Sequence, residues 1–178
     1  MDFETILNFW FNQLTPEQWW KKDLEIDQFI IENFSLIHHQ AISGRLFAWR
    51  KTARGCLAEL IILDQFSRNM FRGTPRSFAY DSMALILSQE AIRKEFDQKL
   101  SISERSFLYM PFMHSESLEI HQQALMLFSA QGLEDALEFE RQHFDIIKRF
   151  QRYPHRNKIL GRSSTALEEQ FLKQHEGF

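Results

Sequence analysis

Apolar residues recur along the chain at the three- and four-residue spacing of amphipathic α-helices. In the stretch 24–41, for example, Phe29, Ile30, Phe34 and Ile37 follow this spacing. The same pattern predicts helices over residues 2–12, 24–41, 55–71, 76–98, 112–130 and 133–150. With short helices after Thr15 and Ser101 and a last one after Thr165, we predict about eight helices joined by short connections.

Residues that begin and end helices support these boundaries. Three signatures combine a capping hydroxyl with a Glu or Gln three residues later, at Thr15 and Gln18, Ser101 and Glu104, and Thr165 and Glu168. The last helix is expected to run to about residue 174. Pro111 is expected to end or open a helix, and Pro154 to stop the helix over 133–150.

Composition favours helices over sheets. Val is absent, and only six Gly and four Pro interrupt the chain, whereas sheets are rich in β-branched residues. Hydrophobic residues make up 44% of the chain and include eighteen Phe and four Trp, enough for an aromatic-rich core. No linker, low-complexity tract or internal repeat stands out. We therefore predict an all-α chain that forms a single compact domain over residues 1–178.

Several classes of protein do not fit the sequence. The single Cys56 lies in the apolar run CLAELIIL, so we interpret it as a core residue and expect neither a disulfide framework nor a Cys-rich zinc site. The start MDFETILNFWF lacks the basic stretch and cleavage site of a signal peptide. No apolar run approaches the roughly 20 residues of a membrane span. We expect a cytoplasmic protein without a membrane partner.

Charge is unevenly distributed along the chain. The formal net charge is -3, which argues against general nucleic-acid binding. Residues 141–162 nevertheless carry seven Arg and Lys residues against one acid, Asp145. Binding of single-stranded RNA or tRNA through this segment is a minor alternative, and it predicts an affinity that falls steeply with added salt.

Two charged residues interrupt the apolar face of the helix predicted over 55–71. The face continues from Leu60 into Asp64 and Arg68, which are four residues apart and can pair on one side of a helix. A buried Asp needs a charged, hydrogen-bonded partner. The pair is therefore either a clamp that fixes a helix junction or part of the wall of a ligand pocket.

Histidines mark two further segments. In MPFMHSESLEIHQQ, His114 and His121 share a helix face, while Glu116 points about 160° away from His114 if both are helical. His143 lies on the apolar stripe of the helix over 133–150. Each histidine is either a structural hydrogen-bonding residue or a proton carrier. The His-x-Glu spacing differs from that of zinc hydrolases, so no metal site is predicted. A metal held by His114, Glu116 and His143 is left as an alternative.

The stretch RFQRYPHRNKILGR, residues 149–162, concentrates positive charge near a helix end. Arg149 and Arg152 lie where cations interact favourably with the helix dipole. Pro154 disfavours the α conformation of the residue before it, so His155 and its neighbours are expected in a turn. Guanidinium groups bind carboxylates and phosphates through paired hydrogen bonds. Helix capping explains part of this charge, and its density favours a polar site.

Three motifs together resemble the bacterial family catalogued as domain of unknown function 924. They are LDQFSRNMFRGT, FLYMPFMHSE, and RFQRYPHRN followed by LGRSST, and the resemblance covers nearly the whole chain. The family usually has Gly where this chain has Gln151. The resemblance implies a fold similar to tetratricopeptide-like helical arrays and no settled activity. It implies as motif positions Asp64, Gln65, Arg68, Asn69, Arg72, His114, Glu116, His143, Arg149, Arg152, His155, Arg156 and Asn157.

From these residues we predict one polar pocket that binds an anionic small molecule. His114, Glu116 and His143 are the candidate catalytic residues for acid/base chemistry, and the other motif positions are the candidate ligand-binding residues. One alternative is a tetratricopeptide-like module that holds a peptide or protein partner, with Trp10, Trp19 and Trp20 as apolar anchors. Another is that the motifs are buried ion pairs that lock helix junctions.

Overall fold

The computed structural model describes residues 1–174. Every regular element in this range is a helix, which confirms the prediction of an all-α chain. The chain forms two compact units. Unit 1 contains Met1–Arg72 and Arg76–Pro111, and unit 2 contains Gly73–Pro75 and the chain from Phe112 onward. The single domain over residues 1–178 and its tetratricopeptide-like arrangement stay predictions.

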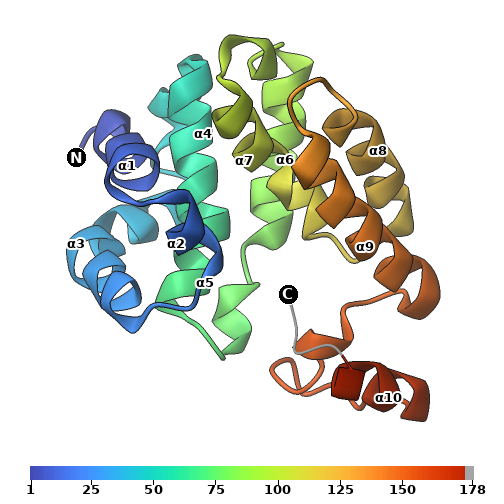
Figure 1. Cartoon of the computed structure of the whole chain (residues 1–178). Coiled ribbons are helices and arrows are strands. Elements are labelled where there is room, and N and C mark those ends of the chain that lie inside the picture. The colour runs from blue at the N-terminus through green and yellow to red at the C-terminus, as the bar shows by residue number, and fades with distance from the viewer. Residues whose placement is uncertain (175–178) are drawn as a thin grey trace. The chain divides into compact units, whose positions relative to one another are not determined.

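Unit 1 holds helices α1 to α6 and most of α7 (Figure 1). Their bounds are α1 Phe3–Asn8, α2 Pro16–Trp20, α3 Leu24–Ile42, α4 Ala53–Ile61, α5 Ser67–Met70, α6 Asp81–Arg93 and α7 Ile102–Met113. Two π-helical turns, Phe9–Gln13 and Ile62–Phe66, extend α1 and join α4 to α5. The helices predicted over 2–12, 24–41 and 55–71 are therefore present.

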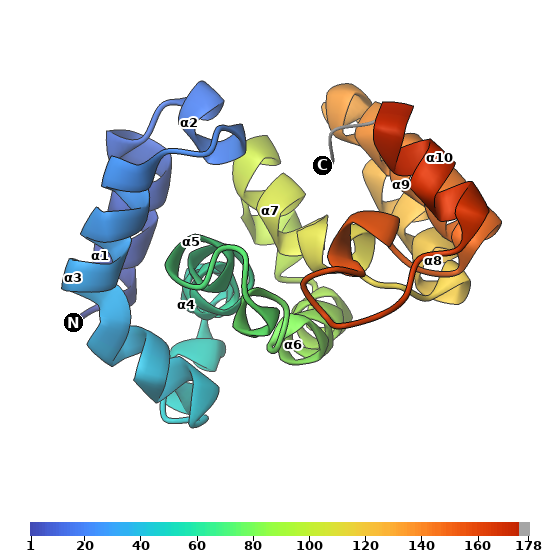
Figure 2. The ribbon, with the colours of Figure 1, turned by 90° about the horizontal axis from the view of Figure 1, so that it is seen from below.

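The continuous helical run from α4 to α5 is enclosed by other helices of unit 1. α4 packs on α1 and on α6, and α3 packs on α5 and on the π-helical turn before it (Figures 1 and 2). Every residue from 55 to 67 is buried as a result. A helix that is apolar on most sides is expected in such a central position.

Aromatic rings fill the core of unit 1. The ring centre of Phe34 lies 5.0 Å from that of Phe66 and 5.1 Å from that of Phe9, and Trp10 meets Phe66 at 5.8 Å. Such pairs stabilise a core by roughly 0.5–1.5 kcal/mol beyond their burial. Trp10, one of the tryptophans considered as partner anchors, is 2% exposed and belongs to this core, whereas Trp20 is 64% exposed.

Unit 2 contains α8 (Leu118–Phe128), α9 (Glu134–Phe150) and α10 (Ala166–Gln174). α8 and α9 lie side by side as an antiparallel pair (Figures 1 and 2). Ile146 and Ile147 on the buried face of α9 form a core with Tyr153, and Phe171 of α10 packs against it. The helices predicted over 133–150 and after Thr165 are present.

Pro111 neither ends nor opens a helix, so this prediction is wrong. It lies inside α7, which continues to Met113, and α8 begins at Leu118 rather than at residue 112. Proline has no N–H, so α7 continues past Pro111 without the hydrogen bond to the carbonyl of Phe107, four residues earlier. At the end of α7, the carbonyl oxygen of Met113 accepts a hydrogen bond from the hydroxyl of Tyr153.

α9 ends ahead of Pro154, by a different device from the one predicted. Its C-cap, Gln151, has a φ of 60° in the left-handed region, which stops the helix three residues before the proline. Tyr153 is extended, and Pro154–Arg156 form a turn, as expected around a proline.

The three predicted capping pairs are present. Backbone N–H to side-chain oxygen distances are 2.8 Å for Thr15 and Gln18, 2.9 Å for Ser101 and Glu104, and 2.7 Å for Thr165 and Glu168. Because capping involves residues three apart, the local sequence was sufficient to identify these helix starts.

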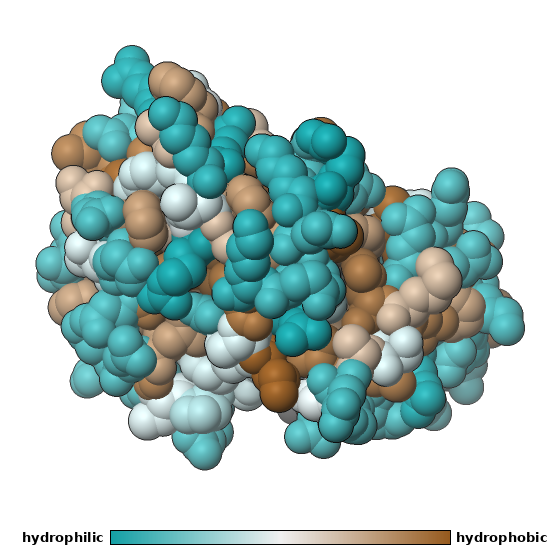
Figure 3. All heavy atoms as spheres, turned by 90° about the horizontal axis from the view of Figure 1, so that it is seen from above, coloured by the Kyte–Doolittle hydropathy of each residue, from teal (hydrophilic) through white to brown (hydrophobic). Residues whose placement is uncertain are grey.

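The surface is mixed in polarity. Hydrophilic side chains cover much of the face shown in Figure 3, with hydrophobic residues between them. Leu36 of α3, Met126 of α8 and Leu167 of α10 are among the exposed apolar residues. No helix within residues 1–174 is long and apolar enough to cross a membrane.

Candidate functional site

Asp64 and Arg68 form the ion pair that their spacing predicts. Arg68 Nη1 lies 3.2 Å from Asp64 Oδ1 and donates to Asp64 O at 2.8 Å. The same guanidinium donates to both carboxylate oxygens of Asp81, at 2.9 and 3.0 Å. Asp64 is completely buried, so its charge depends on such contacts. Arg68 thereby ties α5 to the start of α6.

Asn69 and Arg72 bind the carboxylate of Asp27 in α3. Arg72 donates from Nε and Nη2 at 2.7 Å each, and Asn69 Nδ2 donates to Oδ1 at 2.8 Å. Gln65 donates to the carboxylate of Asp64. All the residues predicted from the first motif therefore bind protein groups within unit 1.

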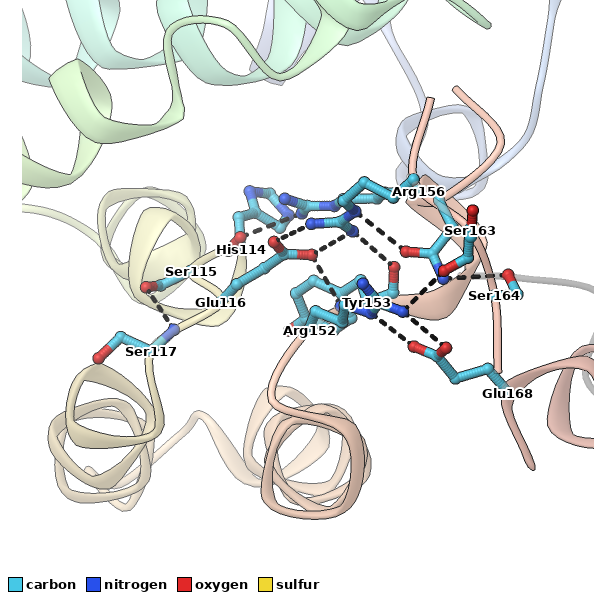
Figure 4. Close-up of polar contacts among 12 residues, drawn as sticks. His114, Ser115, Glu116, Ser117, Arg152, Tyr153, Arg156, Ser163, Ser164 and Glu168 are labelled. Carbon is cyan, nitrogen blue, oxygen red and sulfur yellow. Dashed lines mark hydrogen bonds and ion pairs between the residues drawn. The ribbon is translucent and has the colours of Figure 1, made fainter. Parts of the chain in front are cut away.

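The second and third motifs meet in unit 2, at the C-terminal end of α7 (Figure 4). Carbonyl groups at a helix end lack partners within the helix. Here the carbonyls of Met113, the last residue of α7, and of the two residues after it accept side-chain hydrogen bonds. Met113 O accepts from Tyr153 Oη, His114 O from Arg156 Nη2 at 3.0 Å, and Ser115 O from His121 Nε2 at 2.8 Å. The third motif thus caps the end of the second.

Glu116, one of the predicted catalytic residues, anchors the third motif (Figure 4). Its carboxylate accepts hydrogen bonds from Arg162 at 2.6 and 2.8 Å and from the backbone N–H of Tyr153 at 2.7 Å. Burial alone would raise the pKa of Glu116, but these hydrogen bonds outweigh it and hold the pKa below its usual value. Glu116 is therefore an ionised group with both oxygens engaged.

Arg152 and Asn157 fasten the loop 151–165. Arg152 donates to both oxygens of the buried Glu168, at 2.6 and 2.8 Å, and this contact lowers the pKa of Glu168 to about 2. Asn157 Nδ2 donates to Ser164 Oγ at 3.0 Å, and Asn157 Oδ1 accepts from Arg162 Nε at 3.0 Å. These side chains hold the loop against the start of α10.

The other basic residues of the third motif differ in exposure. Arg156 is buried, with its guanidinium 4.6 Å from the ring centre of Tyr153. His155 places its ring 5.4 Å from the same tyrosine. Arg149 is exposed and lies over Phe150 at 4.8 Å. Arg156 and His155 of the third motif therefore both contact the ring of Tyr153.

His143 contacts backbone and ring groups of unit 2. Its Nδ1 donates to Phe139 O at 2.7 Å, and its ring centre is 5.7 Å from that of Tyr153. Burial lowers the pKa of His143 to about 4 in spite of this hydrogen bond, so the imidazole is neutral at physiological pH. The acid/base roles of His114, Glu116 and His143 stay predictions.

A fully buried His–Glu pair lies beside the capped end of α7. His121 Nδ1 and Glu140 Oε1 are 2.7 Å apart, and neither side chain is exposed. Burial raises the pKa of Glu140, and the contact with His121 offsets this only in part. Both residues lie on apolar helix faces, which is the signal that singled out Asp64, yet neither is among the predicted site residues.

The predicted site residues divide between the two units. Residues 64–72 belong to unit 1 and residues 114–157 to unit 2. Within each unit several of them are held by partners 13 to 46 positions away in the chain. Asp27, Asp81 and Arg162 are among these partners, and no local spacing could reveal them. Among residues 1–174, no three His, Cys, Asp or Glu side chains are grouped as metal ligands would be.

A hollow of about 300 Å³ lies in unit 1, beside the first motif. Its walls include apolar side chains of α3 and α5 and polar ones from the same region, namely Ile31, Ile42, Met70, His38, His39 and Arg76. None of the described residues that line it is an acid. The guanidinium of Arg76 lies 3.8 Å from the ring centre of Phe71, which also lines the hollow.

His38 is the most buried polar side chain named in this wall, with 3% exposure. Its Nε2 lies 2.9 Å from Ser67 Oγ, and its ring meets those of Phe71 and Tyr80 at 5.3 and 5.4 Å. Burial and, to a lesser degree, the positive charge of Arg76 lower the pKa of His38 to about 4. A polar residue on the apolar face of α3 could have indicated this position in the sequence.

Comparisons with known proteins agree with the three motifs. The family model described as "Bacterial protein of unknown function (DUF924)" matches residues 6–176. A solved structure of a protein of unknown function from Agrobacterium tumefaciens is 38% identical, covers 97% of each chain and has a TM-score of 0.92. No curated protein matches the chain. The chain belongs to the bacterial family of unknown function DUF924.

Proposed function

We propose that this protein binds a small anionic molecule in the hollow of unit 1. The observation that carries the proposal is the composition of its walls. A guanidinium and two imidazoles face a largely apolar hollow whose described lining includes no acid. Concave sites with apolar walls and a few polar groups are typical ligand sites, and here each charged group that can contribute is a cation.

Arg76 differs from four arginines of the motifs in what it contacts. Arg68, Arg72, Arg152 and Arg162 each bind a carboxylate of the protein. Arg76 instead lies over Phe71, and no carboxylate of residues 1–174 is within ion-pair distance of it. A guanidinium placed on an aromatic face keeps its N–H groups available for an anion.

This proposal keeps the class of ligand predicted from the sequence, a small anion, and places it in the hollow of unit 1 instead of among the motif residues. The neutralised arginines of the motifs support the interpretation of those motifs as clamps, whereas the wall of the hollow supports anion binding. Catalysis forms no part of the proposal, because the carboxylate chosen for acid/base chemistry, Glu116, is held by Arg162.

An NMR titration of the isotope-labelled protein tests the proposal. The probes are benzoate and phenyl phosphate, which each combine an anionic group with an apolar ring. Wild type is compared with Arg76→Ala and with Arg149→Ala, a matched control because Arg149 also lies over a phenylalanine but in unit 2. We expect saturable shifts around the hollow in wild type and Arg149→Ala, and about tenfold weaker binding in Arg76→Ala.

Two results would contradict the proposal. If neither probe shifts the signals of the hollow in wild type, the hollow is not an anion site. If Arg149→Ala loses binding and Arg76→Ala keeps it, the anion binds the basic segment predicted from the sequence instead.

A further inference from the structure

A buried hydrogen bond beside the hollow determines which nitrogen of His38 carries the proton. Ser67 is completely buried, and His38 is 3% exposed. Among residues 1–174, the side-chain oxygen of Ser67 has one hydrogen-bond partner, His38 Nε2 at 2.9 Å. A buried hydroxyl needs an acceptor for its hydrogen. Ser67 therefore donates, and His38 Nε2 is the acceptor.

The other ring nitrogen then has a defined role. A neutral imidazole carries one proton, so a ring that accepts at Nε2 is protonated at Nδ1. Among the described residues, Nδ1 has no hydrogen-bond acceptor within the protein, and His38 is part of the wall of the hollow. An occupant of the hollow is the remaining source of an acceptor for this N–H besides solvent.

From this arrangement we infer that the occupant is a monocarboxylate with an apolar body, whose carboxylate accepts hydrogen bonds from His38 Nδ1–H and the Arg76 guanidinium. The inference rests on the proposed function, since it names the class of anion that the hollow selects. It makes His38 a specificity-determining residue, positioned by Ser67.

The charges around the hollow favour a monoanion over a dianion. Arg76 contributes one full positive charge, and His38 contributes a neutral donor, because its pKa is lowered to about 4. His39 also lines the hollow. A phosphate dianion would leave negative charge uncompensated against Ile31, Ile42 and Met70, which is unfavourable.

The helix that supplies most of the wall adds to this preference. Ile42 is the last residue of α3, and His38 and His39 lie in its last turns. The C-terminal end of a helix carries partial negative charge, which disfavours a second negative charge on the occupant. The apolar side chains of the wall favour a ligand with an aliphatic or aromatic body.

Two measurements on the full chain test the inference. The first records the nitrogen chemical shifts of the His38 ring above pH 6, which report the tautomer directly. We expect a proton on Nδ1 in the unliganded protein and a changed Nδ1–H signal when benzoate is added.

The second measurement compares three probes of similar body, benzoate, phenyl phosphate and the uncharged benzamide. Benzoate is expected to bind about tenfold more tightly than either of the others. Ser67→Ala should weaken benzoate binding about fivefold to tenfold, because the tautomer is no longer held. Ser88→Ala is the control, since Ser88 is equally buried in unit 1 and donates to Leu108 O.

The outcomes separate this inference from the proposed function. If His38 carries its proton on Nε2, or if phenyl phosphate binds as tightly as benzoate, the inference is wrong while anion binding in the hollow stands. If no probe shifts the hollow, both are wrong. If Ser67→Ala does not fold, the inference is still tested on wild type, by the tautomer of His38 and by the relative affinities of the three probes.

Discussion

Glu140 and His121 are both completely buried in unit 2 and share a 2.7 Å hydrogen bond. His121 Nε2 donates to Ser115 O, so the ring is protonated there, and a second proton lies between Nδ1 and Glu140 Oε1. The pair has no net charge with that proton on either atom, which limits the penalty of burial. Among the described residues, Glu140 Oε2 has no hydrogen-bond partner.

Replacing Glu140 tests this description of the pair. Burial raises the pKa of Glu140, and Glu140→Gln keeps a side chain that can donate a hydrogen bond to Nδ1. We expect Glu140→Gln to lower the free energy of unfolding by less than about 1 kcal/mol, and Glu140→Met, which leaves Nδ1 unsatisfied, by about 1–3 kcal/mol. Urea unfolding measures both.

The exposed Glu138 on the same helix provides the control, since it is 62% exposed and only loosely paired with Arg141 at 3.5 Å. Glu138→Met should change the free energy of unfolding by no more than about 0.5 kcal/mol. Equal losses for Glu140→Gln and Glu140→Met would contradict a shared proton, because the hydrogen bond would then contribute nothing.

Among the helices, α9 ends at a C-cap residue whose backbone conformation is unusual for a residue other than glycine. Gln151 adopts a φ of 60° at its C-cap, a conformation that glycine reaches easily and that other residues adopt at a penalty. The left-handed residue turns the chain sharply between α9 and the loop that carries Arg152. The family that this chain resembles usually has glycine here, and glycine adopts the left-handed conformation without this penalty.

Gln151→Gly is therefore expected to stabilise the protein by about 0.5–1 kcal/mol, measured as a higher midpoint in urea unfolding. Glycine removes the conformational penalty of the left-handed residue, and this gain in stability exceeds the loss caused by the larger conformational entropy of glycine in the unfolded chain. Gln142→Gly in the exposed interior of α9 is the matched control and should destabilise by about 1 kcal/mol. A loss of stability in both variants would show that the Gln151 side chain stabilises this end of α9.

At the scale of the whole molecule, the carboxylates of unit 2 link stability to pH. The pKa of Glu168 is about 2 and that of Glu116 is lowered, against a usual value of 4.5. A group with a lowered pKa in the folded state stabilises it fully above its unfolded pKa and loses this effect as pH falls toward the folded one. Glu140 has a raised pKa in the folded state, so it favours the folded state at low pH, and this contribution is lost as pH rises.

Arg152→Gln is expected to show this dependence in thermal unfolding. At pH 7 the variant should melt several degrees below wild type, because Glu168 loses its partner. The difference should shrink as pH falls from about 4.5 toward 2, because Glu168 becomes increasingly protonated and its ion pair with Arg152 is lost from wild type as well. Arg141→Gln, which removes an exposed pair, serves as the control, and a difference that grows with acidity in Arg152→Gln would contradict the assignment.

The role of the molecule as a tetratricopeptide-like module for a peptide or protein partner stays a prediction. Of its proposed anchors, Trp10 is buried in the core of unit 1 and Trp19 donates from Nε1 to Trp10 O at 2.8 Å. The exposed Trp20 stacks on Phe107 at 5.9 Å. These contacts show that the tryptophans have packing roles in unit 1.

The sequence by itself determined the all-α class, most helix positions and the three helix starts that carry capping pairs. Apolar spacing and capping act over three or four residues, so local patterns contain the necessary information. The contact between Asp64 and Arg68 was predictable for the same reason. Pro111 misled the prediction because the loss of one helical hydrogen bond does not by itself end a helix.

Only the tertiary structure decided which polar groups meet. Asp81 binds Arg68 and Glu168 binds Arg152 across 13 and 16 positions, and Asp27 binds Arg72 across 45. The hollow exists because α3 packs against α5, and His38 gains its partner Ser67 from 29 positions away. Such contacts depend on how helices pack, and helix packing joins residues without regard to their spacing in the chain.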